Sequence, residues 1–257
     1  MLIIGGGIVG AAIARDAAMR GYRVALVDQA DFGAGTSSHS SRLAHGGLRY
    51  LEHGDFKLVF EALRERGVLL RIAPHLVRPL PFIFPVHTGD RVGFWKLAAG
   101  MWLYDLLALF RNVPRHRMLG KRKLLRAEPM LRERGLVGGA RYFDAQLDDA
   151  RLTLATIRSA ERHGAALATH VRVSGLEVAG GRVSGVYAAG DDGTPVLIRA
   201  TVVVNATGPW SDRIRSMEDP AARPLLRLTK GTHAMVRRDR IGHTAAITLT
   251  SAIDGRV

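Results

Sequence analysis

Three glycines near the amino terminus have the spacing of a turn that binds a diphosphate. Gly5, Gly7 and Gly10 follow a short apolar run, and an apolar helical pattern follows them. In such a turn the first glycine permits a tight bend, the second lets main chain approach a pyrophosphate, and the third lets the helix pack close to the strand. The pyrophosphate then lies at the positive N-terminus of the helix. A second apolar run ends at Asp28, whose carboxylate is placed to accept hydrogen bonds from an adenosine ribose.

The residues after Asp28 favour a flavin over a nicotinamide. Residues 31–52 carry many small hydroxyl side chains, among them Thr36 and Ser37, and the glycine pair Gly46-Gly47. Hydroxyl groups can donate to a pyrophosphate and a ribityl chain, and a glycine pair lets main chain lie against a flat ring. This segment is interpreted as a cofactor loop. Small residues also end a later apolar run at residues 206–208, where backbone must pass a cofactor.

Six segments along the chain form a recognisable series. They are Ile4-Gly5-Gly6-Gly7-Ile8-Val9-Gly10, Gly35-Thr36-Ser37-Ser38, His45-Gly46-Gly47-Leu48-Arg49-Tyr50-Leu51-Glu52, Asp148-Asp149-Ala150-Arg151-Leu152, Asn205-Ala206-Thr207-Gly208-Pro209-Trp210 and Lys230-Gly231-Thr232-His233. In this order they resemble the FAD-dependent glycerol-3-phosphate dehydrogenases of the respiratory type. The third segment is the specific one, because the glycine motif by itself would indicate only a Rossmann-like flavoprotein.

The resemblance implies FAD as the cofactor, bound without a covalent link through a cysteine, since the chain has none. The residues it predicts for the cofactor site are Gly5, Gly7, Gly10, Asp28, Thr36, Ser37, Ser41, Arg42, Gly46, Gly47, Leu48, Val171, Ala206, Thr207 and Gly208. Arg42 stands where the family usually has a lysine. Family members are also considerably longer, so we expect this chain to be the N-terminal part of such a protein, with the C-terminal part missing.

Oxidising a secondary alcohol with a flavin requires a base for the hydroxyl proton, and a phosphorylated substrate requires fixed cations. His45 and His233 are the candidate bases, because imidazole titrates near neutral pH. Arg49 and Lys230 are the candidate phosphate partners, although Arg49 could equally pair with Glu52. No metal-ligand spacing is present, so no catalytic metal is predicted.

The predicted fold class is α/β, with a discontinuous Rossmann-like FAD-binding domain of residues 1–80 and 145–213. Residues 81–144 and 214–257 are expected to form a partial α+β substrate domain. Further predictions are a short edge strand around residues 79–85 with three prolines, a helix capped by Asp148, a meander over residues 167–198, and a fully buried parallel strand at residues 201–206.

The charge pattern leaves two interpretations open. The formal net charge is +14, and residues 111–134, expected to form a loop, carry nine Lys and Arg against two acids. An aromatic, apolar helix is predicted just before this block, at residues 94–104. Together they are typical of a segment that binds an anionic membrane surface. Alternatively, the helix is core and the arginines are solvated. No membrane-spanning run is present, and the absence of cysteine fits a reducing cytoplasm.

The resemblance therefore predicts oxidation of sn-glycerol 3-phosphate to dihydroxyacetone phosphate, with electrons passed to a quinone. The expected location is the cytoplasm, peripheral on the inner face of the cytoplasmic membrane. One alternative is an amine or 2-hydroxy-acid oxidoreductase of the same flavin superfamily, and another is an inactive flavin-binding fragment. A third alternative, from another class, is a non-catalytic basic module that binds nucleic acid or membrane, but it would not explain the glycine turn and Asp28. Nucleic acid is therefore not an expected partner.

Overall fold

The computed structural model describes residues 1–110 and 114–249, which form two compact units. Unit 1 consists of Met1–Ser41 and Asp148–Gly231, and unit 2 of Arg42–Leu147 with the described part of Thr232–Val257. The chain first passes from unit 1 to unit 2 after Ser41, and residues 42–80 pack within unit 2. The start of the predicted basic loop, residues 111–113, and the end of the predicted substrate domain, residues 250–257, lie outside the described residues.

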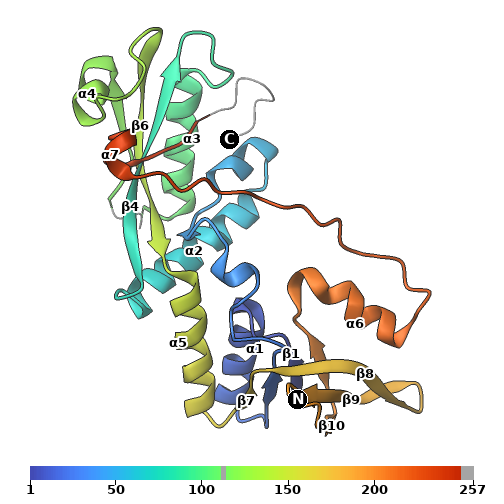
Figure 1. The fold of residues 1–257 in the computed structure, drawn as a ribbon. Helices are drawn as coiled ribbons and strands as arrows, with labels where there is room; N and C mark the ends of the chain where they lie inside the picture. Colours follow the sequence, from blue (N-terminus) through green and yellow to red (C-terminus); the bar gives the residue numbers. More distant parts are fainter. Residues whose placement is uncertain (111–113, 250–257) are drawn as a thin grey trace. The chain divides into compact units, whose positions relative to one another are not determined.

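Unit 1 is built on a parallel four-stranded sheet (Figure 1). Its strand order is β11-β1-β2-β7, with bounds Val203–Asn205, Leu2–Ile4, Ala25–Val27 and Ala166–Ala168. One face of the sheet presents Ile3 and Leu26 to helices α1 (Ile8–Met19) and α5 (Asp149–Arg162). The predicted β-α-β unit is therefore present. Because successive apolar side chains of each short strand point to opposite faces, both faces of the sheet are buried.

The second face of the parallel sheet is covered by an antiparallel sheet of three strands. Leu2, Ile4 and Val27 pack against Val173 and Val186. The order is β10-β9-β8, with bounds Pro195–Arg199, Arg182–Gly190 and Val171–Ala179. The predicted meander is thus confirmed over these strands. The first predicted segment of the meander, however, is two strands. His170, with a positive φ of 57°, separates β7 from β8, and β7 pairs with β2 in the parallel sheet.

Two further predictions in unit 1 had different outcomes. Asp148 caps helix α5, because its Oδ1 accepts a hydrogen bond from the Arg151 amide at 3.0 Å. The strand predicted at residues 201–206 is parallel, as expected, but it is not fully buried. It shortens to β11 and lies at the edge of the four-stranded sheet, so its residues are half-buried or exposed. Two short helices follow it, η3 (Gly208–Trp210) and α6 (Ser211–Glu218).

Unit 2 is built on a mixed five-stranded sheet. The order is β12-β4-β6-β3, with β5 also paired to β6, and the bounds are Ala246–Ile247, Val77–His87, Leu136–Leu147, Leu43–Ala44 and Arg117–Gly120. The long strand β4 contradicts the prediction of a short edge strand. Its prolines at 79, 81 and 85 alternate in register with Ile83, so their backbone groups point to the same side of the strand as those of Ile83. The Ile83 carbonyl faces β12, so none of these prolines removes a hydrogen-bond donor from the ladder to β6.

Helices cover both faces of this sheet. Helices α2 (Phe56–Ile72) and α3 (Phe94–Leu107) pack on the face that carries Phe82 and Phe84. Helix α4 (Lys121–Ala127) packs through Leu124 on the opposite face, beside Ile83. The basic segment is thus not a loop: within its described part it forms β5 and α4. No helix among the described residues is long and apolar enough to cross a membrane.

The remaining elements are short turns and connections. Unit 1 contains the 3-10 turn η1 (Thr36–Ser38), and unit 2 contains η2 (Leu48–His53) and α7 (Arg238–Ile241). Residues 220–237 are exposed chain without regular structure, apart from a half-buried position 222. This segment leads from unit 1 into the last part of unit 2 (Figure 1).

Candidate functional site

A cleft of about 870 Å³ lies within unit 1, at the carboxyl ends of strands β1, β2 and β11. This is where doubly wound parallel sheets bind nucleotides, and the volume falls in the usual range for small-molecule sites. Predicted cofactor residues line much of it, namely Gly5, Gly7, Asp28, Thr36, Ser37, Val171, Ala206, Thr207 and Gly208. Its charged lining residues are Asp28, Arg172 and Arg213.

The three motif glycines have distinct geometries. Gly5 has a φ of +106°, and a Cβ there would lie 2.6 Å from the Ala206 carbonyl oxygen. A Cβ on Gly10 would lie 1.9 Å from the Gly5 carbonyl oxygen, so this glycine is needed for the packing of α1 on β1 and does not line the cleft. A Cβ on Gly7 would meet only Ser37 Oγ, at 3.2 Å. Gly7 is therefore the motif glycine that leaves room for a ligand.

Asp28 and Ser37 hold the main chain around this turn. The Gly6 amide donates to Asp28 Oδ2 at 2.6 Å, and the Ala30 amide donates to Oδ1 at 2.9 Å. Ser37 Oγ accepts from the Ile8 amide at 2.9 Å, which satisfies one donor at the start of α1. Both side chains also line the cleft. Asp28 thus fixes the glycine turn from the end of β2, a role in addition to the predicted contact with a ribose.

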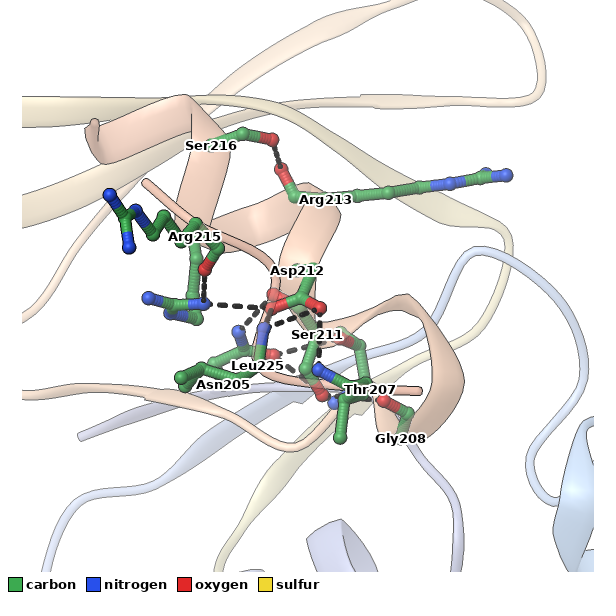
Figure 2. Close-up of polar contacts among 11 residues, drawn as sticks. Asn205, Thr207, Gly208, Ser211, Asp212, Arg213, Arg215, Ser216 and Leu225 are labelled. Carbon is green, nitrogen blue, oxygen red and sulfur yellow. Dashed lines mark hydrogen bonds and ion pairs between the residues drawn. The ribbon is translucent and has the colours of Figure 1, made fainter. Parts of the chain in front are cut away.

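Hydrogen bonds fix the bend after strand β11 (Figure 2). Asn205 Oδ1 accepts from Thr207 Oγ1 at 2.7 Å, and Asn205 Nδ2 donates to the Ser211 carbonyl at 2.9 Å. One residue further, Asp212 accepts from Arg215 at 2.8 Å and from the Leu225 amide at 3.1 Å. This network holds the cleft wall formed by Ala206, Thr207 and Gly208 in one conformation.

Two cleft residues on this wall were not predicted. The Trp210 ring lies within 3.1 Å of the position that a Cβ on Gly35 would take, so it closes the wall against the η1 turn. Arg213 lies one helical turn further on, and its side chain extends away from the Asp212 cluster (Figure 2). Trp210 belongs to a segment that the sequence singles out. Arg213 has no such signal, because a single arginine in a basic chain is unremarkable.

The other predicted cofactor residues do not line this cleft. Ser41 is the last residue of the first segment of unit 1, while Arg42, Gly46, Gly47 and Leu48 belong to unit 2. Arg42 has a φ of +57°, and its carbonyl accepts from the Leu147 amide at 3.0 Å. Gly46 and Gly47 are buried. Their contact with a flavin ring stays a prediction.

The candidate catalytic residues fall into two pairs. His45 and Arg49 are exposed and flank the glycine pair between β3 and η2. Arg49 donates to the Tyr50 hydroxyl at 2.9 Å, and the alternative pairing with Glu52 is not observed. Glu52 instead binds Arg91 at 2.8 Å, and that hydrogen bond lowers the pKa of Glu52.

Lys230 and His233 are exposed in the irregular segment 220–237. Lys230 belongs to unit 1, whereas His233 belongs to unit 2, which also contains His45 and Arg49. Their catalytic roles stay predictions. Among the described residues, no group of three His, Cys, Asp or Glu side chains could hold a metal ion.

Comparison with known proteins assigns the family. The family model of FAD dependent oxidoreductases matches residues 1–256, so the chain belongs to that family. It is 45% identical over 254 residues to a glycerol-3-phosphate dehydrogenase of Mycobacterium leprae, covering 97% of this chain and 43% of that protein. It is 39% identical to an alpha-glycerophosphate oxidase of Streptococcus pyogenes, covering 100% of this chain and 43% of that protein.

A solved structure shows the same fold with the cofactor present. The glycerol-3-phosphate dehydrogenase of Bacillus halodurans, complexed with FAD, superposes with a TM-score of 0.66 at 33% identity, covering 85% of this chain and 36% of that one. The chain thus spans less than half the length of these relatives. The predicted family, fold class and FAD cofactor are confirmed.

The residues in the cleft fit a dinucleotide. Gly7 leaves room on its floor, and the first turn of α1 lines it, where Val9 is 61% exposed. The N-terminus of a helix favours an anionic group. A bound FAD would cover that apolar surface and would place its diphosphate over the glycine turn. Arg172 and Arg213 give the lining one more cation than anion, which suits the two negative charges of a diphosphate.

Proposed function

We propose that the protein carrying this chain oxidises sn-glycerol 3-phosphate to dihydroxyacetone phosphate. The observation that carries the proposal is the dinucleotide cleft of unit 1 in a chain whose relatives are named for glycerol 3-phosphate. Bound FAD supplies the acceptor for the hydride that leaves the substrate carbon. A non-catalytic basic module would leave the cleft and its glycine turn without a role.

The substrate-binding part of the proposal assigns roles to four exposed side chains. His45 or His233 accepts the proton of the substrate hydroxyl as the hydride leaves. Arg49 and Lys230 bind the phosphate, with the arginine fork matching two phosphate oxygens. Arg49 is restrained for this role, because its guanidinium lies 4.9 Å from the centre of the Tyr50 ring and donates to the Tyr50 hydroxyl.

The test is a direct assay of the FAD-loaded protein with a redox dye as electron acceptor. Glycerol 3-phosphate should reduce the dye, while glycerol, glycine and lactate at the same concentration should not. Oxidation of an amino acid or a 2-hydroxy acid instead would support the alternative oxidoreductase. Bound flavin without oxidation of any of these substrates would indicate an inactive flavin-binding protein.

We further propose that a quinone accepts the electrons and that the protein binds the inner face of the cytoplasmic membrane. The support is an apolar stripe on α3 and the residues just after it, formed by Trp95, Ala99, Trp102, Leu106 and Phe110. Trp95 and Trp102 are 82% and 61% exposed. Lys96 and Arg115 adjoin the stripe, the latter 5.3 Å from the Phe110 ring centre. Tryptophans with adjacent cations suit an anionic lipid surface.

Helix α4 is not part of this surface, because it packs on the opposite face of the sheet. Membrane binding is tested by sedimentation with vesicles of phosphatidylcholine and phosphatidylglycerol. The double variant Trp95→Gln and Trp102→Gln should bind at least about tenfold more weakly, since each buried aromatic contributes about 1.5–3 kcal/mol. The matched control is Lys121→Gln with Lys123→Gln on α4. Equal loss in both double variants would contradict the assignment to α3.

The electron acceptor is tested separately. Reduction of a soluble ubiquinone analogue should be faster than reduction of oxygen at equal concentration. A faster reaction with oxygen, accompanied by hydrogen peroxide, would assign the protein to the oxidases that some relatives are named for.

A further inference from the structure

A buried polar cluster in unit 2 is centred on Asp144 of strand β6. Asp144 Oδ1 accepts from the Gly46 amide at 2.9 Å and from the Tyr104 hydroxyl at 3.1 Å, and it forms an ion pair with Arg66. Arg66 also donates to the Tyr104 hydroxyl at 3.2 Å. The side chains of Arg66 and Asp144 are only 6% and 5% exposed. Three elements, α2, α3 and β6, thus converge on the main chain of one glycine.

Gly46 belongs to the turn that carries the candidate catalytic residues His45 and Arg49. Strand β3 pairs with β6, so that Ala44 lies opposite Ala145. The chain leaves the sheet after Ala44, and His45 is exposed. Gly46 then turns inward so closely that a Cβ there would lie 2.1 Å from the Tyr104 hydroxyl oxygen. Gly47, with a φ of +74°, immediately precedes the helix η2 that carries Arg49.

The free energy of folding does not by itself explain why this buried polar cluster is present. A buried ion pair has a large desolvation cost, and apolar residues of similar volume in its place are often neutral or stabilising. An apolar core could not hold the Gly46 amide, however, because a buried amide needs an acceptor. Burial, together with the negative charge of Asp144, raises the pKa of Tyr104 well above its usual value, so this hydroxyl remains a donor.

We propose that Asp144 is a positioning residue. Together with Arg66 and Tyr104 it fixes the main chain at Gly46. This contact thereby sets the direction of the His45 side chain and the face that Gly46 and Gly47 present to the flavin. The inference rests on the proposed function, in which His45 and Arg49 contact the substrate, and on the predicted contact of Gly46 and Gly47 with the flavin. The Asp144 side chain is only 5% exposed, so the role proposed for it involves no direct contact with either.

The test uses the full-length, FAD-loaded protein and its apoprotein with three variants. Asp144→Leu removes the acceptor, Asp144→Asn keeps an oxygen for the Gly46 amide but removes the charge, and the double variant Arg66→Met with Asp144→Leu replaces the pair by apolar groups. Glu128→Gln is the matched control. Glu128 is an equally buried carboxylate in unit 2, but it accepts from Thr244 and Ala245, far from the turn in sequence.

Three readouts separate positioning from stability. In the apoprotein, hydrogen exchange of the peptide that contains residues 43–50 should be about tenfold faster in the double variant than in the wild type, even where its thermal stability is restored. The flavin absorbance maxima of the loaded protein should shift. The kcat should fall by about 10- to 100-fold with a smaller change in KM, since a displacement of about 1 Å can cost about 100-fold.

The outcomes decide between the roles. If the double variant regains wild-type kcat, spectrum and exchange, the cluster is merely structural and the proposal is wrong. If Asp144→Leu does not fold, the double variant decides alone. Asp144→Asn, which keeps the oxygen for the Gly46 amide, should then change exchange, spectrum and kcat less than the double variant does, and a larger change in Asp144→Asn would also contradict the proposal. If the wild type does not oxidise glycerol 3-phosphate, the proposed function fails, while exchange and flavin spectra still test the positioning.

Discussion

Replacing Gly7 by alanine should separate cofactor binding from folding. Gly7 has extended backbone angles that alanine can adopt, and the added methyl carbon would meet only Ser37 Oγ, at 3.2 Å. Ser37 Oγ, which accepts from the Ile8 amide, would have to move by a few tenths of an ångström. We therefore expect the free energy of unfolding to fall by no more than about 1 kcal/mol, the usual contribution of one hydrogen bond. The methyl group would project into the cleft, where the FAD diphosphate must approach the main chain.

The effect on affinity follows from the contact that is lost. A main-chain hydrogen bond to a charged phosphate contributes about 1.5–3 kcal/mol, so displacing the diphosphate from one such donor should raise the Kd for FAD by about 10- to 150-fold. Gly10→Ala should behave differently. Its methyl carbon would lie 1.9 Å from the Gly5 carbonyl oxygen, which cannot move without shifting α1 from β1. Overpacking of this kind costs about 1–3 kcal/mol of stability.

The assay combines urea unfolding of the apoprotein with FAD titration by quenching of flavin fluorescence. Gly67→Ala is the control, because Gly67 lies inside α2 with open space around it, and alanine there should stabilise the protein by about 0.5–1 kcal/mol without changing FAD affinity. Wild-type FAD affinity in Gly7→Ala would refute the assignment of the cleft. Equal destabilisation by Gly7→Ala and Gly10→Ala would refute the separation of roles.

Three further predictions concern other residues. Arg49→Ala should raise the KM for glycerol 3-phosphate by about 10- to 150-fold, and an unchanged KM would exclude Arg49 from phosphate binding. Asp148→Ala should lower the unfolding free energy by about 1 kcal/mol in urea, whereas Asp148→Asn should retain the cap. Burial acts to raise the pKa of Glu128, but hydrogen bonds from Thr244 and Ala245 outweigh it and lower that pKa. Glu128 should therefore stabilise unit 2 above about pH 4.3 and lose this effect as the pH falls further. A melting curve of Glu128→Gln with the wild-type pH slope would contradict this.

Much of unit 1 is determined by local sequence. The order of apolar run, glycine turn, helix and second apolar run defines β1, α1 and β2, because each step depends on neighbouring residues only. The cap at Asp148 is equally local, since it needs only its own carboxylate and an amide three residues on. The motifs also predicted the family and its cofactor, both of which the comparisons confirm.

Contacts between distant segments decided the rest. The prolines of β4 indicate an edge strand when read alone, and only pairing with β6 and β12 shows that their spacing leaves the β6 ladder intact. The boundary at residue 41 likewise depends on which sheet α2 covers. The Asp144 cluster was not predicted, because its members are separated by up to 98 residues in sequence and the key acceptor meets a main-chain amide, which carries no sequence signal. Periodicity and turn residues report local conformation, whereas strand neighbours and buried polar partners depend on how the whole chain packs.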